Sequence, residues 1–512
     1  MYPEKIIPFD SAAAHFAGLR AQGKKIVHCH GTFDLVHPGH LIHLEEARAL
    51  GDVLVVTLTS EKFVNKGPGR PYFNDQLRAR SLAAIGFVDY VVLIPFSNSV
   101  AAIECVRPHI YCKGREYEDP SLDVTGNILE DVRAVESVGG EVRYLGSVVF
   151  SSSRLINNFF SHLPDPIKSF CGQLSRSVSP ENFRDVINGF ETLRVLVVGD
   201  VIFDRYATVR VQGLTSKNRI ISSRFMEEDM QAGGSLAVYR HIKQFCPQTH
   251  LLSLAGTETW ADAEIRRHVA GADDRIIRHE KFTTIIKHRF VEPIAEGKEL
   301  SKLFSVNFID AAPPAEEVVD LILSRLDRML RDYDLVVVAD FGHGLLQEKI
   351  RGLIQAQARF MALNCQTNSN NHGFNIITRQ YHRADCFSLD EMEILLACAR
   401  RHINHREELE KIRAGFGSGY AWLTRGGIET IGLDGKSDPV LLLPFETQVL
   451  DTVGAGDAFF SVAALSAKQG LPIGLATFIG QLAGGQAVKI FGNSKPISKQ
   501  VLLKAGMTLL NH

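Results

Sequence analysis

Short apolar runs alternate with longer mixed segments over residues 25–155 of the chain. Runs of this kind, rich in β-branched and aromatic residues, are typical of strands. We expect five of them, at Ile26–His30, Val53–Leu58, Tyr90–Ile94, Ile110–Lys113 and Glu141–Leu145. The intervening stretches Leu41–Leu50, Asp75–Ile85 and Ile128–Val138 are expected to be helices. Strands separated by helices predict a parallel sheet that is covered on both faces.

A second alternation begins at the apolar strand Arg194–Asp200 and continues to the end of the chain, with later strands at Leu335–Ala339 and Trp422–Thr424. The segment between the two alternations is rich in Pro and Ser, which favours a linker. We therefore expect domains at residues 1–163 and 181–512, joined by a linker at 164–180. The predicted fold class is α/β, with two doubly wound parallel-sheet domains.

Composition narrows the class of protein. The 512 residues are 45% hydrophobic and 22% charged, with a net charge of -2, as in ordinary soluble proteins. A basic or aromatic-interleaved stripe is absent from the sequence, so nucleic acid is not an expected partner. No apolar run reaches membrane-spanning length and no secretion signal is apparent. The eight cysteines stand singly, which argues against a disulfide framework or zinc site and favours a reducing cytoplasm.

The first chemical motif is Gly31-Thr32-Phe33-Asp34-Leu35-Val36-His37-Pro38-Gly39-His40, which directly follows the first strand. His37 and His40 are three residues apart on a strand-to-helix turn, so both imidazoles are expected at one place. That place lies near the C-terminal edge of a parallel sheet, where open α/β folds bind ligands. Imidazoles and helix N-terminal amides both suit phosphate, and the motif predicts a nucleoside triphosphate site. An isolated pair with this spacing would more often cap a turn.

The complete string resembles the GxFDxxHxGH pattern of the cytidylyltransferase-like nucleotidyltransferases. The resemblance implies that His37 and His40 are catalytic and that Gly31, Thr32 and Phe33 contact the nucleotide. Nucleotidyl transfer also needs donors for the departing pyrophosphate. Further candidates follow in order: Lys66 in a glycine-rich loop, Arg78 on the next helix, Lys113 and Gly114 at a strand end, and Ser151, Ser152 and Ser153 before a helix.

The order and spacing of these candidates are similar to those of the adenylyltransferase half of the bacterial bifunctional heptose-phosphate kinase/adenylyltransferases. The resemblance covers about residues 25 to 158. It includes the string from Lys113 to Glu118 and the closing serine cluster. It implies that Lys66 is catalytic and that Arg78, Lys113, Gly114 and the three serines bind nucleotide.

The second motif is Asp451-Thr452-Val453-Gly454-Ala455-Gly456-Asp457-Ala458-Phe459, at the start of an expected helix. Small residues at Gly454, Ala455 and Gly456 let backbone N–H groups approach a phosphate and form an anion hole. Asp457 can accept a proton from an attacking hydroxyl. The string resembles ribokinase-type (PfkB) sugar kinases, which implies a ribokinase-like second domain.

Further matches to that family cover residues 192 to 492. The resemblance implies that Asp200, Asp204, Gly233 and Gly234 lie on the sugar side. It also implies that Thr424 and Gly427 lie on the nucleotide side. The family's Asn-x-x-Glu element, linked to magnesium and phosphate, reads Ser388-Leu389-Asp390-Glu391, which leaves Glu391 as the metal candidate.

Three departures from the family concern the expected kinase site. Ala237 stands where an Asn usually contacts the sugar, and Ser388 replaces the Asn of the magnesium-linked element. The heptose kinases have an Asp-Pro-Lys turn where this chain has the amide-rich segment 364–373. Asn-rich segments usually form turns, but this one is also compatible with an altered ligand site. The departures point to a different acceptor or to a lost kinase activity.

The two halves together resemble the bifunctional enzymes of ADP-heptose synthesis with the domain order reversed. The resemblance implies a sugar kinase followed by a nucleotidyltransferase, using ATP, or CTP in the N-terminal domain, to make a nucleotide sugar for surface lipopolysaccharide. Magnesium (Mg²⁺) is implied by triphosphate chemistry. Expected partners are a sugar phosphate, a nucleoside triphosphate and a second copy of the chain in a homo-oligomer. Two alternatives stay open: a non-catalytic kinase-like module, and a cytidylyltransferase for a non-sugar alcohol phosphate.

Overall fold

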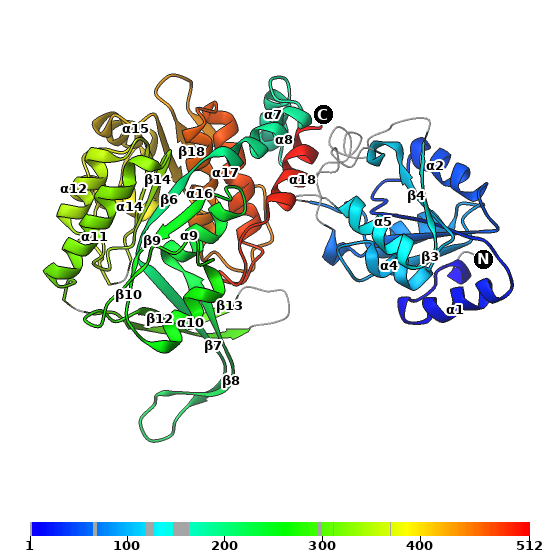
Figure 1. Cartoon of the computed structure of the whole chain (residues 1–512), viewed down its shortest axis with the longest axis horizontal. Helices are drawn as coiled ribbons and strands as arrows, with labels where there is room; N and C mark the ends of the chain where they lie inside the picture. The colour runs from blue at the N-terminus through cyan, green and yellow to red at the C-terminus, as the bar shows by residue number, and fades with distance from the viewer. Residues whose placement is uncertain are drawn as a thin grey trace. The chain divides into compact units, whose positions relative to one another are not determined.

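The computed structural model describes residues 3–64, 69–118, 127–146, 163–293, 300–310, 312–368 and 370–511. The chain divides into two compact units (Figure 1). Unit 1 comprises residues 1–184 and 503–512, and unit 2 comprises residues 185–502. The segment predicted as a linker contains helix α7 (Asp165–Leu174), and helix α8 (Pro180–Gly189) starts at its end. Its prolines stand in first helical turns, where no backbone hydrogen bond is lost, so they start helices here.

Unit 1 is built on a parallel five-stranded sheet in the order β3-β2-β1-β4-β5. Its strands confirm the five predicted ones: β1 (Ile26–Gly31), β2 (Val53–Thr59), β3 (Tyr90–Ile94), β4 (Ile110–Gly114) and β5 (Glu141–Leu145). The strand order reverses between β1 and β4. Ligands of open α/β sheets bind outside the carboxyl ends of the strands at such a reversal.

Helices cover both faces of this sheet: α1 (Phe9–Ala21), α2 (Pro38–Arg48), α3 (Asp75–Ala83), α4 (Val100–Val106) and α5 (Asn127–Ser137). Alternate residues of β1 face different helices. Val27 and Cys29 pack in a core with Leu44 of α2 and Leu82 of α3. Ile26 belongs to the core on the other face, with residues of α1 and α4. Both faces are buried, which explains why the strands are continuous apolar runs.

The main sheet of unit 2 has eight strands in the order β19-β18-β17-β16-β15-β14-β6-β9. The strands are β6 (Val195–Gly199), β9 (Thr249–Leu252), β14 (Leu335–Asp340), β15 (Met361–Cys365), β16 (Cys386–Asp390), β17 (Tyr420–Thr424), β18 (Thr430–Leu433) and β19 (Val440–Leu442). Strands β17 to β9 in this order are parallel, and β18 and β19 are antiparallel additions at one edge. The predicted α/β class is thus confirmed, with a mixed sheet in unit 2.

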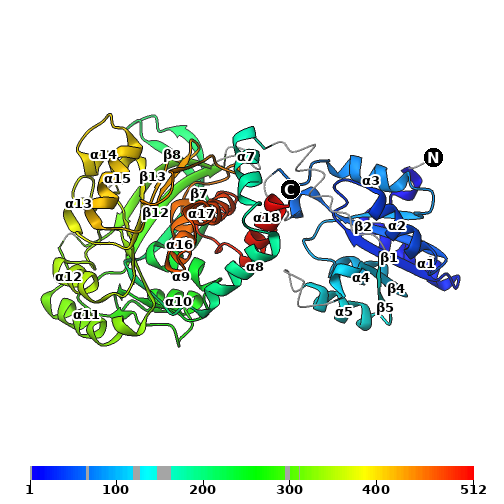
Figure 2. The same ribbon diagram turned by 90° about the horizontal axis from the view of Figure 1, so that it is seen from above.

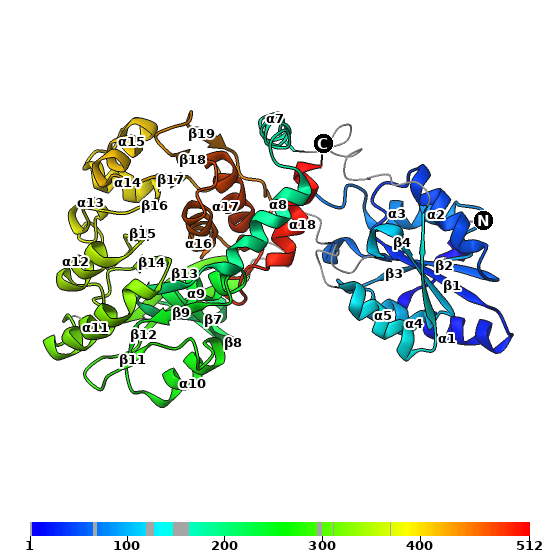
Figure 3. The ribbon, with the colours of Figure 1, turned by 45° about the horizontal axis from the view of Figure 1, so that its top comes forward.

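Figure 3 shows helices on both sides of this sheet. One side carries α9 (Gly234–Lys243), α16 (Ala455–Lys468) and α17 (Ile473–Ala487). The other carries α11 (Glu316–Met329), α12 (Glu348–Gln357), α14 (Glu391–Cys398) and α15 (His405–Phe416). Further helices are α10 (Thr259–His268), α13 (Ile377–Gln380) and α18 (Lys499–Leu510), and most of α18 belongs to unit 1. Within the described ranges, no helix combines the length and apolar character needed to cross a membrane.

A second sheet in unit 2 was not predicted (Figure 2). It contains β7 (Val201–Leu214), β8 (Ile221–Gly233), β12 (Ile285–Pro293) and β13 (Leu300–Phe308), in the order β13-β12-β7-β8. The outer halves of β7 and β8 are largely exposed, so their sequences lack the apolar run of a core strand. A small sheet pairs β10 (Leu254–Ala255) with β11 (Ile277–Arg278).

Candidate functional site

The two predicted imidazoles of unit 1 meet at the start of α2. His37 precedes the helix in an extended conformation, and Pro38 occupies its first turn. The rings of His37 and His40 stack, with centroids 3.9 Å apart and planes 19° apart. Phe33 lies against His40 edge-on at 5.2 Å. The turn after β1 therefore places both imidazoles at a helix N-terminus, where the backbone already favours anions.

The predicted nucleotide contacts Gly31, Thr32 and Phe33 shape this turn. Phe33 has a left-handed backbone (φ 45°) and is 7% exposed, because its ring belongs to the core beneath α2 and α3. A Cβ on Gly31 would lie 3.0 Å from that ring, which explains the glycine. The carbonyl of Thr32 accepts a hydrogen bond from Arg78. Gly31, the carbonyl of Thr32 and the ring of Phe33 therefore all help to shape this turn.

Arg78, also predicted to contact nucleotide, is 1% exposed. Its guanidinium donates to the carbonyls of Thr32 at 2.7 Å and Phe73 at 3.0 Å, and to the Asp75 carboxylate at 2.5 Å. These contacts connect α3 to the turn that precedes His37 and His40. The side chain is therefore placed to position that turn from inside the protein, because a buried guanidinium must satisfy its donors internally.

Lys113 stands at the carboxyl end of β4, beside the reversal of the strand order. Its ammonium pairs with Asp131 at 2.9 Å and lies 5.4 Å from the ring centres of Tyr111 and Tyr117. Burial lowers the pKa of Lys113, but Tyr111 and Asp131 outweigh that effect and the pKa is raised overall. The lysine is therefore positively charged at the sheet edge. Gly114 ends the same strand. Lys66, Ser151, Ser152 and Ser153 lie outside the described residues.

A polar cluster on β1 and β2 was missed by sequence reasoning. The hydroxyl of Thr57 lies 2.7 Å from both His28 Nε2 and His30 Nδ1. Burial and the charge of Lys113 lower the pKa of His30 to about 3, so this imidazole is neutral. Residues two apart on a strand share a face. The spacing of His28 and His30 was therefore the available signal.

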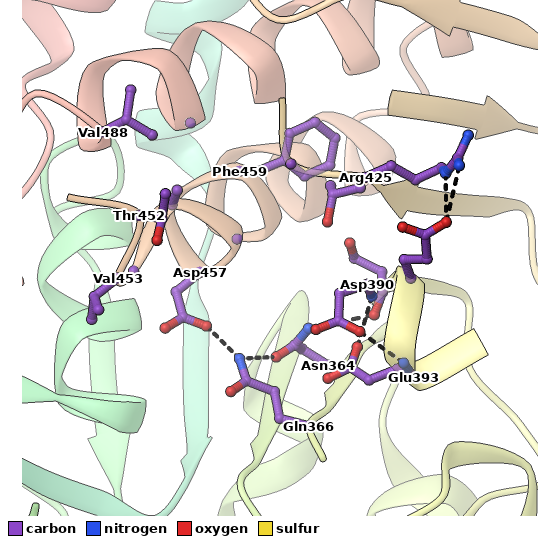
Figure 4. A pocket seen from close by; sticks show the side chains of 18 of the residues that line it. Asn364, Gln366, Asp390, Glu393, Arg425, Thr452, Val453, Asp457, Phe459 and Val488 are labelled. Atoms are coloured by element: carbon purple, nitrogen blue, oxygen red, sulfur yellow. Dashed lines mark hydrogen bonds and ion pairs between the residues drawn. The ribbon is translucent and has the colours of Figure 1, made fainter. Parts of the chain in front are cut away.

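Unit 2 contains a cavity of about 670 Å³ (Figure 4). The predicted residues that line it are Asp204, Gly234, Glu391, Thr424, Gly427, Gly454, Ala455, Gly456 and Asp457. Asp200 and Gly233 are not among its lining residues. The structure therefore brings together segments that are more than 200 residues apart in the sequence, from the second sheet to the start of α16.

Asp457 lies in the first turn of α16 and points into this cavity. It is 9% exposed and accepts a hydrogen bond from Gln366 Nε2 at 2.7 Å. Burial raises the pKa of Asp457 to about 6; the hydrogen bond from Gln366 opposes this, and the charge of Asp204 adds to it. A carboxylate with this pKa is mostly ionised at pH 7 and can accept a proton.

The helix start itself is shaped for an anion. Gly454 precedes α16 with a left-handed backbone (φ 79°), and no side chain caps the helix there. A Cβ on Gly454 would overlap the side chain of Asn493. First-turn amides of a helix lack partners within the helix and carry its positive dipole end. Glycine is therefore required here by the close approach of Asn493, and the amides beside it are groups that a phosphate could contact.

The second sheet contributes positive charge to the cavity, which sequence reasoning missed. Lys287 and Arg289 are two apart on β12, and both line the cavity. Arg289 forms an ion pair with Asp204. Lys287 makes no hydrogen bond or ion pair with any described residue, and burial lowers its pKa. The acceptor side of the cavity therefore offers a cation that a neighbouring carboxylate does not neutralise by direct contact.

Asp200 does not line the cavity, and its carboxylate instead binds the backbone of the loop after β14. Its carboxylate accepts backbone hydrogen bonds from His343 at 3.2 Å and Leu345 at 3.3 Å. A Cβ on Gly233 would overlap the Asp204 carboxylate, and one on Gly234 would lie 2.5 Å from the Asp200 carbonyl oxygen. The paired glycines are thus required by close packing against the two aspartate segments.

Glu391, the predicted metal ligand, lines the cavity but is already contacted by Arg425 and His405. Its carboxylate pairs with Arg425 at 2.9 Å and His405 at 3.1 Å (Figure 4 shows the Arg425 pair). Among the described residues there is no group of three or more His, Cys, Asp or Glu side chains that could hold a metal ion. Mg²⁺ commonly needs only one or two carboxylates when nucleotide phosphates supply the other ligands. The residues present fit that mode and not a dedicated protein site.

Most of the amide-rich segment builds a turn. Asn368 and Asn371 both donate to the carbonyl of Phe341 at 2.7 Å. Asn375, just after the segment, donates to Asp340. Asn364 and Gln366 instead line the cavity, as does Ser388. Ala237 is buried in α9 and does not line it. The turn interpretation is therefore confirmed for Asn368 and Asn371, and the altered ligand site stays a prediction for the part of the segment that lines the cavity.

Comparison with known proteins agrees with this division of the chain. The cytidylyltransferase-like family model matches residues 28–143. The chain is 38% identical over 147 residues to the bifunctional protein HldE of Methylobacillus flagellatus, covering 28% of this chain and 29% of that protein. It is 40% identical over 146 residues to the bifunctional protein HldE of Pelobacter propionicus, covering 28% of each. The chain thus spans less than a third of the length of these relatives.

Solved structures resemble the other part of the chain. Phosphofructokinase-2 from Escherichia coli in complex with potassium superposes with a TM-score of 0.50 and 14% identity, covering 62% of this chain and 99% of that one. The same enzyme with substrates and products gives 0.50 and 13%, with the same coverage. At this identity the likeness concerns the fold. The chain therefore combines an N-terminal region that matches the cytidylyltransferase-like family model with a C-terminal region that has the fold of phosphofructokinase-2.

Proposed function

We propose that the chain is a bifunctional transferase. In this proposal unit 2 phosphorylates a sugar with ATP, and unit 1 then joins the resulting sugar phosphate to a nucleotide from ATP or CTP. The observation that carries the proposal is Asp457, a buried carboxylate at the uncapped start of α16 inside a cavity of about 670 Å³. A proton acceptor beside a helix N-terminus is the pairing that phosphoryl transfer to a hydroxyl requires.

In the kinase step, Asp457 takes the proton of the acceptor hydroxyl while that oxygen attacks the γ-phosphorus of ATP. The bond from the γ-phosphorus to the bridging oxygen breaks, and ADP leaves. Amides at the start of α16 lie where they can stabilise the phosphate charge. Lys287 adds a cation on the second-sheet side of the cavity.

In the nucleotidyl step, a phosphate monoester attacks the α-phosphorus of the triphosphate and pyrophosphate leaves. Catalysis then depends on holding two anions in line and stabilising the developing charge. His37 and His40 would contribute hydrogen-bond donors at the N-terminus of α2, and Lys113 a positive charge at the end of β4. Mg²⁺ would enter both steps with the nucleotide and neutralise phosphate charge.

Support for a heptose-phosphate-like substrate comes from the N-terminal domain, whose relatives are named bifunctional protein HldE. A role in ADP-heptose and lipopolysaccharide synthesis, and hence a cytoplasmic location, follows from that proposal. The test is a grid of pyrophosphate-release assays with ATP or CTP against heptose, other sugar and alcohol phosphates, including glycerol phosphate and phosphocholine. Sugar phosphates should be the preferred acceptors. A preference for CTP with an alcohol phosphate would contradict the sugar assignment.

The kinase half has its own test, which separates a working kinase from a non-catalytic module. ATP consumption is measured with the same sugars and sugar phosphates in the wild-type chain and in Asp457→Asn. Turnover that depends on Asp457 supports the kinase. A complete lack of Asp457-dependent turnover with every acceptor would leave unit 2 as a ligand-sensing or assembly module.

We also propose that the chain forms a homo-oligomer through the second sheet of unit 2. The β7–β8 hairpin projects from the body of its unit (Figure 1) and exposes Ile220, Ile221 and Phe225. The same strand also carries basic and acidic residues such as Arg224 and Glu227. Light scattering should give a multimer for the wild-type chain and a monomer for Phe225→Asp. A monomeric wild-type chain would contradict the proposal.

A further inference from the structure

An unusual hydrogen-bond chain reaches the candidate base from the neighbouring strand (Figure 4). Gln366 directly follows β15, and its Nε2 donates both to Asp457 Oδ1 at 2.7 Å and to Asn364 Oδ1 at 2.8 Å. Asn364 in turn donates through Nδ2 to the carbonyl of Ser388 at 3.4 Å. The chain therefore runs from the backbone of β16 to the carboxylate on α16.

The polarity of this chain is fixed by its ends. The Ser388 carbonyl can only accept, so Asn364 must direct its nitrogen to Ser388 and its oxygen to Gln366. Gln366 must then present its NH₂ group, with one hydrogen for Asn364 and one for Asp457. If the Asp457 carboxyl were protonated, its O–H group could donate a hydrogen bond only to Gln366 Nε2. That amide nitrogen has no lone pair available to accept it. The arrangement consequently favours the ionised carboxylate.

We propose that Gln366 is a positioning residue that holds the Asp457 carboxylate in the ionised state and orientation needed to accept the proton of the acceptor hydroxyl. The inference rests on the proposed kinase function for its catalytic meaning, whereas the effect on the carboxylate is independent of that function.

Other charged groups act on the same carboxylate. Asp204 of β7 disfavours its ionisation, and Lys287 of β12 favours it. The charge of Asp457 in turn contributes to raising the pKa of Glu393 of α14. Burial also raises the pKa of Asp457, which lies at about 6 with all these groups in place. Among these influences, Gln366 provides the hydrogen bond to the carboxylate oxygen. Removing its donor should therefore raise the pKa further.

The experiment measures the ionisation of Asp457 directly in the full-length chain. The chain is labelled with aspartate carrying ¹³C in the side-chain carboxyl group, and the Asp457 signal is assigned by its loss in Asp457→Asn. Its titration midpoint is then compared in the wild type, Gln366→Leu, Gln366→Glu and Gln366→Lys. The control is Gln357→Leu, because Gln357 donates to Asp327 at the same 2.7 Å distance on an exposed helix surface.

The wild-type midpoint should lie near pH 6. Gln366→Leu should raise it by about one pH unit, the scale of a lost hydrogen bond to a charged group. Gln366→Glu should raise it at least as far, whereas Gln366→Lys should lower it below the wild-type value. Gln357→Leu should leave it unchanged. If Gln366→Leu does not fold, the opposite shifts expected for the glutamate and lysine variants still decide. Equal midpoints in the Gln366 variants and the wild type would overturn the proposal.

The acidic limb of the kinase pH–rate profile provides the catalytic readout. It should move to higher pH in Gln366→Leu together with the carboxyl midpoint, whereas a purely structural loss would lower the rate at every pH without moving the limb. A shifted carboxyl midpoint with no kinase turnover in the wild type would contradict the proposed function and leave the positioning of Asp457 intact. Kinase turnover with an unmoved midpoint would contradict the inference alone.

Discussion

His37 and His40 lie three residues apart at the start of α2, and their imidazole rings stack with centroids 3.9 Å apart. The stack explains how a turn of this length concentrates two hydrogen-bonding rings at one helix terminus. The positive end of the helix dipole adds to the same place. A triphosphate held there would meet donors from the side chains and from the backbone.

Changing His37 or His40 to Ala should lower nucleotidyl transfer by at least ~10²-fold, the scale for losing a donor to a developing charge. Pyrophosphate release at saturating nucleotide measures the effect. The far-UV circular dichroism should stay that of the wild-type chain, and the ATPase rate of unit 2 should be unchanged. Wholesale unfolding of either variant would argue that the rings serve the fold instead of catalysis.

The kinase rate should depend on pH through Asp457. The carboxylate must be ionised to accept a proton, and its pKa is raised to about 6, so the rate should fall as the pH drops through about 6. Asp457→Asn should lower the rate by roughly 10²- to 10⁴-fold, the usual contribution of a general base. Initial rates between pH 5 and pH 8 test this. A rate independent of pH in that range would contradict the role of Asp457 as base.

The buried pair Lys113–Asp131 should be a stability element of unit 1. Asp131→Asn leaves the ammonium without its counter-ion and should cost about 3 kcal/mol or more. Both tryptophans, Trp260 and Trp422, lie in unit 2, so tryptophan fluorescence does not follow the unfolding of unit 1. The unfolding of unit 1 in urea is therefore measured by circular dichroism.

Tryptophan fluorescence then supplies the internal control for that experiment, because its midpoint should not move in Asp131→Asn. The double variant Lys113→Met, Asp131→Leu should recover part of the loss, since no charge is left buried. A single variant as stable as the wild type would show that water reaches the ammonium.

Gly454 and Gly470 bound α16 and allow a matched comparison. Both have left-handed backbones, with φ 79° and 70°. Alanine at Gly470 meets no atom within 4 Å, so it should cost only about 1 to 2 kcal/mol of backbone strain. Alanine at Gly454 must also displace Asn493 at the anion site. It should raise the KM for ATP and lower the kinase rate, whereas Gly470→Ala should keep both near the wild-type values. Equal kinetics for the two variants would contradict the anion site.

The sequence was most informative where one physical constraint dominates. Strands such as Ile26–His30 are buried on both faces, so an apolar run is sufficient to find them. Helix α1, with only Ala12 and Phe16 buried, gives a weak pattern and was missed. The second sheet of unit 2 was missed for the same reason, because the outer part of β8 is exposed. Lys287 and Arg289, which lie on this second sheet and line the cavity, were therefore not predicted either.

Among the candidate site residues, the histidine pair and Asp457 could be predicted because their motifs are local. Arg78 and Asp200 show the limit of that approach. Each is polar and near a motif, yet each is buried and bonded to backbone groups that only the tertiary structure brings close. The contact between Gln366 and Asp457 spans 91 residues, and nothing in the sequence around either residue indicates it.

The most direct test of the account follows both steps in one reaction. The full-length chain is incubated with ATP, Mg²⁺ and a heptose phosphate that lacks the 1-phosphate, and products are followed by ³¹P NMR. The wild type should form ADP, pyrophosphate and a nucleotide sugar. His37→Ala should accumulate the sugar 1-phosphate, and Asp457→Asn should make nucleotide sugar only when the 1-phosphate is supplied. Nucleotide sugar formed by Asp457→Asn without that supplement, or no reaction of the wild type with either sugar, would contradict the account.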